Sequence, residues 1–219
     1  TDTVDSAASV EVGPERGRFA LPDFPRGPGF HIGWTNFPVE VEKRLYQQRL
    51  PAAQAFVRAN GLDRVLLDAP QRRLGIVTTG KAYLDVREAL ASLGIDEALA
   101  RDLGLAIYKV ALSWPLEPEG ALGFCRGLSD VLVVEEKRVV IEDQLARLLY
   151  NQSQRPRLAG KRDAVGAPLV PAEGELAPGL VAELIRRWLE GAAAGVAVRL
   201  RPAPPAPVAS PPGQLTRLP

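Results

Sequence analysis

The sequence predicts an α/β fold with an open, mainly parallel sheet that is covered by helices on both faces. Three apolar runs, 74–79, 105–110 and 130–135, are rich in the aliphatic and β-branched residues of strands. Each run is followed by a segment whose apolar residues recur at helical spacing. Strands that alternate with helices favour parallel pairing with right-handed crossovers. We therefore expect one α/β domain over residues 64–200.

The first 63 residues are expected to form an extended arm followed by short helices. Residues 1–37 carry several prolines and glycines and show neither a helical nor an alternating period. Between residues 38 and 60 the apolar spacing is helical, but Pro51 removes a backbone donor and clashes with the preceding turn. Two short helices that meet at Leu50 and Pro51 are therefore favoured over one.

Within the domain, a run at 64–68 and a run at 74–79 predict two strands that are separated by a turn. The next helix is predicted from four apolar residues before Gly94, namely Tyr83, Val86, Leu90 and Leu93. After the strand at 105–110, a helix is expected from Pro118 to Gly127. The run at 130–135 is almost continuously apolar, which is typical of a strand covered on both faces.

The last third of the chain predicts two further helices, a short strand and a linker. The first helix carries Ile141, Leu145 and Leu148, and a weaker strand is expected around residues 157–160. The final helix has one apolar face, which is formed by Val181, Leu184, Ile185 and Trp188. Residues 201–219 include a proline-rich run that suits an extended polyproline linker.

Composition excludes several classes of protein. The 27 Lys and Arg residues balance 26 Asp and Glu residues, so no net field draws the chain to nucleic acid or to an anionic membrane. One cysteine and one histidine are too few for a disulfide framework or for an autonomous zinc or iron-sulfur site. The absence of a long apolar run and the acidic N-terminus favour a cytoplasmic protein. Because the chain starts at Thr1 and has no methionine, we expect a piece of a longer protein.

A pattern of Gly, four residues, Gly and Lys at positions 75–81 resembles a phosphate-binding loop. The following residue, Ala82, cannot hold magnesium as Ser or Thr would, and the intervening residues form strands, so nucleotide binding is not expected. Open α/β sheets nevertheless bind ligands at the carboxyl ends of their strands. A ligand site there would use Thr78, Thr79, Gly80 and Lys81. The alternative is a tight turn with a solvated lysine.

Three further candidates have structural interpretations. Gly27, Gly29 and Gly33 resemble a dinucleotide fingerprint, but their spacing is one residue too long and no strand precedes them. His31 has no recognisable partner, so we interpret it as a loop residue. Cys125 lies on the apolar side of its helix and is expected to be a core thiol.

A second group of residues follows the other strands. Glu135 and Glu136 stand where a strand becomes a helix, and they suit the positive end of that helix, although contact with another domain is an alternative. Together with Ser113 and Trp114 they should share one face with residues 78–81. We interpret this face as a docking surface centred on Trp114, while the competing interpretation is that Trp114 covers its own core.

Four ordered blocks, 74–87, 108–110, 114–118 and 133–138, resemble the indolepyruvate ferredoxin oxidoreductases. The residues Leu-Pro-Ala-Ala-Gln-Ala that begin at Leu50 are also similar, and the resemblance extends over about residues 38–190. It implies a central domain similar to the C-terminal domain of transketolase. Enzymes of that family decarboxylate an aryl pyruvate on thiamine diphosphate and magnesium, pass electrons through a [4Fe-4S] cluster to ferredoxin, and form an acyl-coenzyme A.

The resemblance carries no catalytic residue to this chain. The sequence has neither a Gly-Asp-Gly motif with a downstream Asn for magnesium diphosphate nor four cysteines for a cluster. It therefore implies a noncatalytic structural domain, with no cofactor of its own, in a larger oxidoreductase. Its partners would be neighbouring thiamine-binding domains, with ferredoxin and a homo-oligomer for the parent enzyme. The alternative is an independent module that binds coenzyme A or a small ligand at Thr78 to Lys81.

Overall fold

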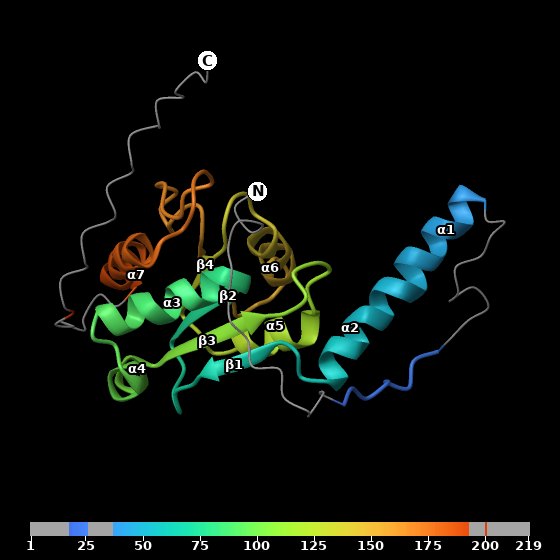
Figure 1. The fold of residues 1–219 in the computed structure, drawn as a ribbon, viewed down its shortest axis with the longest axis horizontal. Coiled ribbons are helices and arrows are strands. Elements are labelled where there is room, and N and C mark those ends of the chain that lie inside the picture. Colours follow the sequence, from blue (N-terminus) through green and yellow to red (C-terminus); the bar gives the residue numbers. More distant parts are fainter. Residues whose placement is uncertain (1–17, 26–36, 193–199, 201–219) are drawn as a thin grey trace, which may run out of the picture.

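The computed structural model describes residues 18–25, 37–192 and 200 (Figure 1). The glycine group at 27–33, His31 and the proline-rich linker at 201–219 lie outside the described residues. Among the described residues, no helix combines the length and the apolar character needed to cross a bilayer.

A five-stranded, mostly parallel sheet forms the centre of the molecule and confirms the predicted fold class. Its strands lie in the order β1-β3-β2-β4-β5. The bounds are Arg64–Leu67 for β1, Leu74–Thr79 for β2, Leu105–Val110 for β3, Asp130–Val134 for β4 and Arg157–Ala159 for β5. Only β1 runs antiparallel to its neighbour, which is β3 rather than β2. Strands β1 and β2, which follow one another in the sequence, are thus separated in the sheet by β3.

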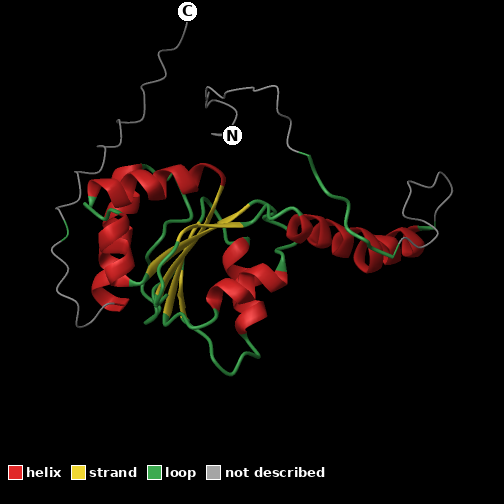
Figure 2. Ribbon diagram, turned by 90° about the horizontal axis from the view of Figure 1, so that it is seen from below, coloured by secondary structure: helices red, strands yellow, loops and turns green. Residues whose placement is uncertain are grey.

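Helices cover both faces of the sheet (Figure 2). Successive residues of each strand point to opposite faces, so that Ile76 packs on one side and Val77 on the other. The first face is covered by α3 (Gly80–Ser92), α4 (Glu97–Leu103) and α7 (Pro178–Ala192). The second face is covered by α5 (Pro118–Cys125) and α6 (Ile141–Leu149).

Local chemistry explains two features of this arrangement. Helix α4, which the sequence reading did not predict, begins at an Asp96 side chain that accepts a hydrogen bond from the Leu99 amide at 2.8 Å. It ends at Gly104, whose left-handed φ of 67° favours glycine. Gly75 lies within β2, as expected, where an added Cβ would come within 2.6 Å of the Leu128 side chain. Packing therefore accounts for this glycine of the phosphate-loop pattern.

The segment before the sheet is an unbroken helical run rather than two separate helices. It consists of α1 (Pro38–Arg44), a π-helical turn η1 (Leu45–Arg49) and α2 (Leu50–Ala59). Pro51 falls in the first turn of α2, and the amide of Leu50 bonds to the Leu45 carbonyl in the π pattern. The junction lies where it was predicted, but the π turn accommodates the missing proline donor without a break.

Polar contacts attach α2 to the α/β body, whereas α1 extends away from it (Figure 1). The Gln54 side-chain amide donates to the Leu116 carbonyl at 2.8 Å. The Arg58 guanidinium pairs with the buried Glu117 carboxylate at 3.0 Å. The described part of the arm, residues 18–25, contacts α2 through Phe19, whose ring centroid lies 5.7 Å from that of Phe56.

Candidate functional site

The carboxyl ends of β2, β3 and β4 lie at one edge of the sheet because these strands are parallel neighbours. At the end of β2, Thr78 is completely buried, and its hydroxyl has no hydrogen-bond partner among the described residues. The Thr79 hydroxyl donates to the Val110 carbonyl at 2.8 Å. Gly80 then begins α3 with a left-handed φ of 53°. The Thr79 hydroxyl is therefore used within the chain, and the Thr78 hydroxyl is shielded from solvent.

Lys81 is held by acceptors within the chain. Its ammonium nitrogen lies 3.0 Å from an Asp85 oxygen, 3.0 Å from a Glu175 oxygen and 2.8 Å from the Leu176 carbonyl. Desolvation alone would lower the pKa of Lys81, but the hydrogen bonds to the two carboxylates outweigh it and raise the pKa. A lysine ammonium has three N–H donors. All three therefore have acceptors, and Lys81 is not the solvated lysine of the alternative interpretation.

Glu135 caps helix α6 from the end of β4. Its buried carboxylate accepts the amides of Val140 at 3.1 Å, Ile141 at 2.9 Å and Glu142 at 3.0 Å. These amides belong to the helix N-terminus, where no intrahelical acceptor is available. The capping interpretation of Glu135 is thus confirmed, and its charge is committed to the fold.

A segment that is distant in sequence closes this edge. Residues 171–176, which we call the 171–176 segment, receive hydrogen bonds from three lysines, one of which is Lys81, and donate one to Glu136. The Leu176 amide donates to the Glu136 carboxylate at 2.9 Å, and Lys137 donates to the Gly174 carbonyl at 2.8 Å. Lys161, whose pKa burial lowers, donates to the Glu135 carbonyl at 2.6 Å and to the Pro171 carbonyl at 3.1 Å. The segment therefore ties together the ends of β2 and β4.

Sequence reasoning did not identify Asp85, Lys161 or Glu175 as members of this group. Asp85 lies four residues after Lys81 on the same helix, a spacing that favours an ion pair. Lys161 and Glu175 had no comparable pattern, because their contacts join residues far apart in sequence. These contacts form one connected group, which we call the strand-end network. It consists of the 171–176 segment, which includes Glu175, and five further charged residues: Lys81, Asp85, Glu135, Glu136 and Lys161.

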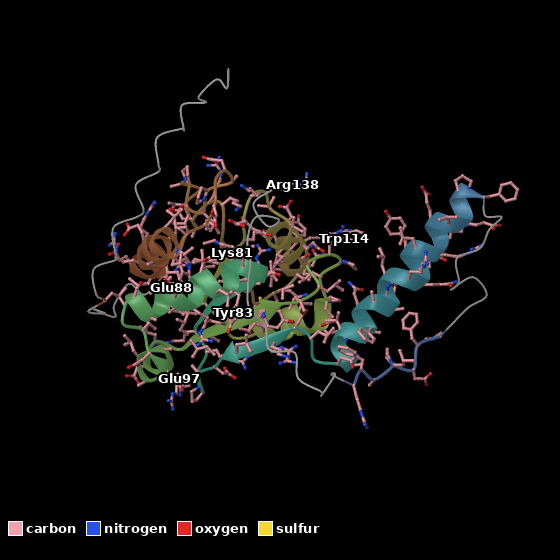
Figure 3. All side chains as sticks on the ribbon, in the orientation of Figure 1. Lys81, Tyr83, Glu88, Glu97, Trp114 and Arg138 are labelled. Atoms are coloured by element: carbon pink, nitrogen blue, oxygen red, sulfur yellow. The ribbon has the colours of Figure 1, made fainter. Side chains whose placement is uncertain are left out.

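Trp114 lies apart from the strand-end network, on the loop that follows β3 (Figure 3). Its side chain is 54% exposed, so it does not cover its own core. The loop is held from two sides. The Gln144 side chain donates to the Ser113 carbonyl at 2.8 Å and accepts from the Leu116 amide at 2.7 Å, while the Asp63 carboxylate accepts from the Ala111 amide at 2.7 Å. The structure thus presents an exposed indole on a fixed loop.

The described residues do not fit a metal centre or a cysteine nucleophile. Cys125 is buried on α5, and burial raises the pKa of its thiol to about 12. Among the residues that the structure describes, no three His, Cys, Asp or Glu side chains are grouped so that they could hold a metal ion. The one cysteine of the chain cannot supply the set of thiolates that holds an iron-sulfur cluster.

Comparisons with known proteins identify relatives of one kind. The chain is similar to the indolepyruvate oxidoreductase subunit IorA of Thermococcus kodakarensis, with 34% identity over 118 residues, 53% of this chain and 16% of the relative. The IorA subunit of Pyrococcus abyssi is 31% identical over 177 residues, 80% of this chain and 25% of the relative. The chain thus spans a quarter or less of these curated relatives.

Among the solved structures that match the chain are two with 17% sequence identity. A 2-oxoglutarate:ferredoxin oxidoreductase from Magnetococcus marinus gives a TM-score of 0.45 over 81% of this chain and 28% of that one. A split-gene transketolase, described as an inactive beta4 tetramer, gives 0.42 over 60% and 42%.

The family model gives the broadest assignment. The model of the indolepyruvate oxidoreductase domain matches residues 64–199, which include all five strands of the sheet. This match covers more than half of the chain. The chain therefore belongs to the indolepyruvate oxidoreductase domain family.

Proposed function

We propose that this chain is a noncatalytic central structural domain of an oxidoreductase. The parent enzyme would convert indolepyruvate or a related aryl 2-oxoacid, coenzyme A and oxidised ferredoxin to an acyl-coenzyme A, carbon dioxide and reduced ferredoxin. Family membership supports the class of enzyme, and the names of the curated relatives support indolepyruvate as the substrate. Thiamine diphosphate, magnesium and the [4Fe-4S] cluster would be held by other domains of that cytoplasmic, homo-oligomeric enzyme.

The observation that carries the structural role is the closed strand-end network. Open α/β sheets bind ligands outside the carboxyl ends of their strands. Here Lys81 has three acceptors from its own chain, and Glu135 has three amide donors from α6. A ligand at this edge would have to break these interactions before it gained its own. The arrangement therefore favours a scaffold over a module that binds coenzyme A.

Trp114 supplies a contact for a neighbouring thiamine-binding domain. An exposed aromatic side chain on a fixed loop loses little conformational entropy when it is buried by a partner, and tryptophan is enriched among residues that dominate binding energy. The loop of Trp114 is held by Gln144 and Asp63, so its position is set before any partner binds. We infer that the docking surface is the Trp114 loop rather than the strand-end network.

The test is Trp114→Ala in the full-length protein. We expect ferredoxin reduction driven by indolepyruvate to fall at least about fivefold, because a central interface residue has been removed, while the chain unfolds at an almost unchanged denaturant concentration. Tyr150→Ala is the matched control, since Tyr150 is also an exposed aromatic residue but lies at the end of α6. Full activity of the Trp114 variant would refute the docking role, and activity of the chain alone would refute the noncatalytic assignment.

A further inference from the structure

Strand β1 forms one rim of the sheet, and its outer side has no strand beside it among the described residues. In Figure 1 it lies below β3, with no labelled helix or strand along its far side. Backbone N–H and C=O groups along such an edge are not paired within the sheet, so they can pair with an added strand. The other rim is formed by β5, which is only three residues long. The longer of the two free edges is therefore that of β1.

This edge is apolar at its centre and charged at its two ends. The sequence that begins at Arg64 is Arg-Val-Leu-Leu-Asp. Val65 and Leu66 are 37% and 41% exposed, although both are apolar. Leu66 is the extra residue of a bulge, because the register with β3 passes from Val65 directly to Leu67. Apart from this bulge, the centre of the strand has none of the lysines, prolines or inward charges that usually protect an edge strand.

The charged ends of the edge have the capacity for a further partner. The Arg64 Nε donates to the Gly61 carbonyl at 3.1 Å, and its two Nη groups have no partner within the described part of the chain. Asp68 pairs with Arg72, yet its side chain remains 52% exposed. A carboxylate offers about four acceptor sites. Asp68 uses one for the Ala69 amide and two for Arg72, so one remains.

We propose that two copies of this chain pair antiparallel along β1. Two identical strands related by a two-fold axis place one residue opposite itself at the centre, and each other contact occurs twice. With Leu66 at the centre, Arg64 lies opposite Asp68 of the second copy. Opposite charges directly across a pair of strands stabilise the pairing, and like charges destabilise it. A centre at either neighbouring residue separates the two charges, so the sequence favours this one register.

The pairing closes on itself and is weak. Because the contact uses the β1 edge of both copies, it gives a dimer rather than a growing chain of molecules. One pair of short strands buries less than the roughly 1,200–2,000 Å² of standard interfaces, so we expect a dissociation constant on the order of 100 µM. The surface is separate from the Trp114 loop. The proposal rests on this edge and not on the proposed enzyme activity, so the two can fail independently.

The test is sedimentation equilibrium of the whole chain at concentrations from about 10 to about 500 µM. We expect the average mass of the parent chain to rise toward that of a dimer. Arg64→Asp and Asp68→Arg each place like charges opposite one another twice, so each variant should associate at least about tenfold more weakly. Arg101→Asp is the matched control, because Arg101 is exposed and also donates its Nε to a backbone carbonyl, but it lies on α4.

An equimolar mixture of the two interface variants tests the register. The two acidic strand ends of one variant then face the two basic strand ends of the other, so the mixture should recover most of the association that each variant lacks alone. In the ¹⁵N-labelled parent chain, the amide resonances of residues 64–67 should shift with concentration while those of β5 stay in place. A parent chain that stays monomeric at about 500 µM, an Arg64→Asp variant that associates as tightly as the parent, or a mixture that fails to associate would overturn the proposal.

Discussion

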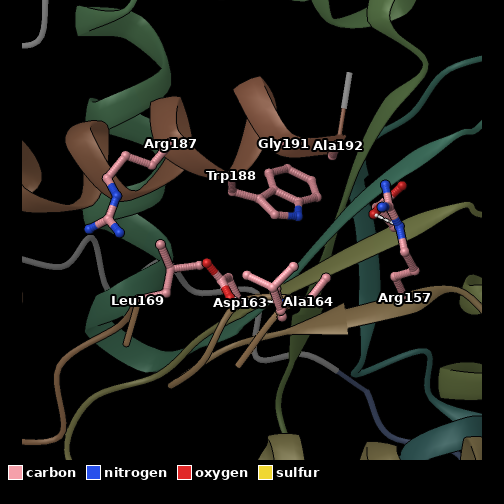
Figure 4. A pocket seen from close by; sticks show the side chains of 11 residues that line it. Arg157, Asp163, Ala164, Leu169, Arg187, Trp188, Gly191 and Ala192 are labelled. Carbon is pink, nitrogen blue, oxygen red and sulfur yellow. Dashed lines mark hydrogen bonds and ion pairs between the residues drawn. The ribbon is translucent and has the colours of Figure 1, made fainter. Parts of the chain in front are cut away.

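The two ends of the sheet differ in how their polar groups are satisfied. At the carboxyl end, Lys81 and Glu135 each have three partners from the chain itself. At the amino end, the described polar contacts are fewer: Asp130 and Arg157, the first residues of β4 and β5, pair with each other at 2.8 Å beside a cavity lined by Trp188 and Leu169 (Figure 4). The comparison indicates that the edge at which α/β sheets usually bind ligands is used here to hold distant segments of the chain together.

The centre of the sheet, which both ends share, should show the largest effect of substitution. Val133 is 1% exposed in β4, and it packs between the sheet and α6. Val133→Asp would place an unpaired charge there and should lower the free energy of unfolding by more than about 4 kcal/mol. Chemical denaturation followed by circular dichroism measures this loss. Val165→Asp makes the same change at a position that is 89% exposed and should be nearly neutral; similar losses in both variants would contradict the core assignment.

Alanine substitutions of the two described tryptophans, Trp114 and Trp188, should also differ strongly in their effect on the free energy of unfolding. Trp188→Ala removes a ring that packs against the first face of the sheet, and we expect a loss of about 3 kcal/mol. Trp114→Ala, at an exposed loop position, should change the free energy of unfolding of the chain by less than about 1 kcal/mol. Urea denaturation of the two variants side by side measures the difference. If Trp114→Ala were the more damaging change, Trp114 would be a structural residue and the docking proposal would fail.

Removal of the Glu135 side chain should disrupt the strand-end network at the carboxyl ends of the parallel strands. Glu135→Ala leaves three amides of α6 without their acceptor, and we expect a loss of about 2 kcal/mol. Hydrogen exchange should show that the first turn of α6 loses most of its protection. Glu88→Ala, on the exposed side of α3, is the control for the loss of one negative charge. Unchanged protection of α6 in the Glu135 variant would mean that the cap contributes little.

The smallest effect concerns pH and the loop that carries Trp114. Burial raises the pKa of Asp63 above its ordinary value of 3.8, against the opposing effect of the Ala111 and Leu112 amides. The folded protein then binds this proton more tightly than the unfolded chain, so the stabilising contribution of Asp63 is complete below 3.8 and is lost as the pH rises through the raised pKa. The Asp63→Asn variant has no carboxyl group at this position, so it lacks this dependence of stability on pH.

We therefore expect the stability of the Asp63→Asn variant, relative to the parent chain, to increase between acid and neutral pH. Urea denaturation at a series of pH values measures this trend. Asp102→Asn, at an exposed position, controls for the loss of a surface charge. The opposite trend with pH would show that the hydrogen bonds of Asp63 outweigh its burial.

Much of the fold could be predicted from short-range patterns in the sequence. The runs at 74–79, 105–110 and 130–135 are rich in aliphatic and β-branched residues and are followed by segments with helical spacing, so the central strands and their parallel pairing could be predicted. Helix α4 was missed because it is only seven residues long, which is too short for a helical period to stand out. The π turn before Pro51 was missed because propensity shows that a proline disturbs a helix but not how the preceding turn adapts.

The candidate site was predictable in its position but not in its contacts. Parallel topology alone places Thr78, Lys81 and Glu135 at one edge. The acceptor for Lys81 on Leu176 lies 95 residues further along the chain, and no local pattern indicates such a pairing. The exposure of Trp114 likewise depends on the path of its loop, which Gln144 and Asp63 fix through long-range hydrogen bonds.

The most direct test of the structural role is a calorimetric titration of the chain with coenzyme A. If the strand-end network already satisfies the polar groups at the carboxyl ends of the strands, coenzyme A up to about 1 mM should give only the heat of dilution. Any dissociation constant would then lie well above that range. Lys81→Met should give the same result as the parent chain. A saturable heat with the parent chain that disappears in Lys81→Met would contradict the account, because it would show a ligand displacing the acceptors of Lys81.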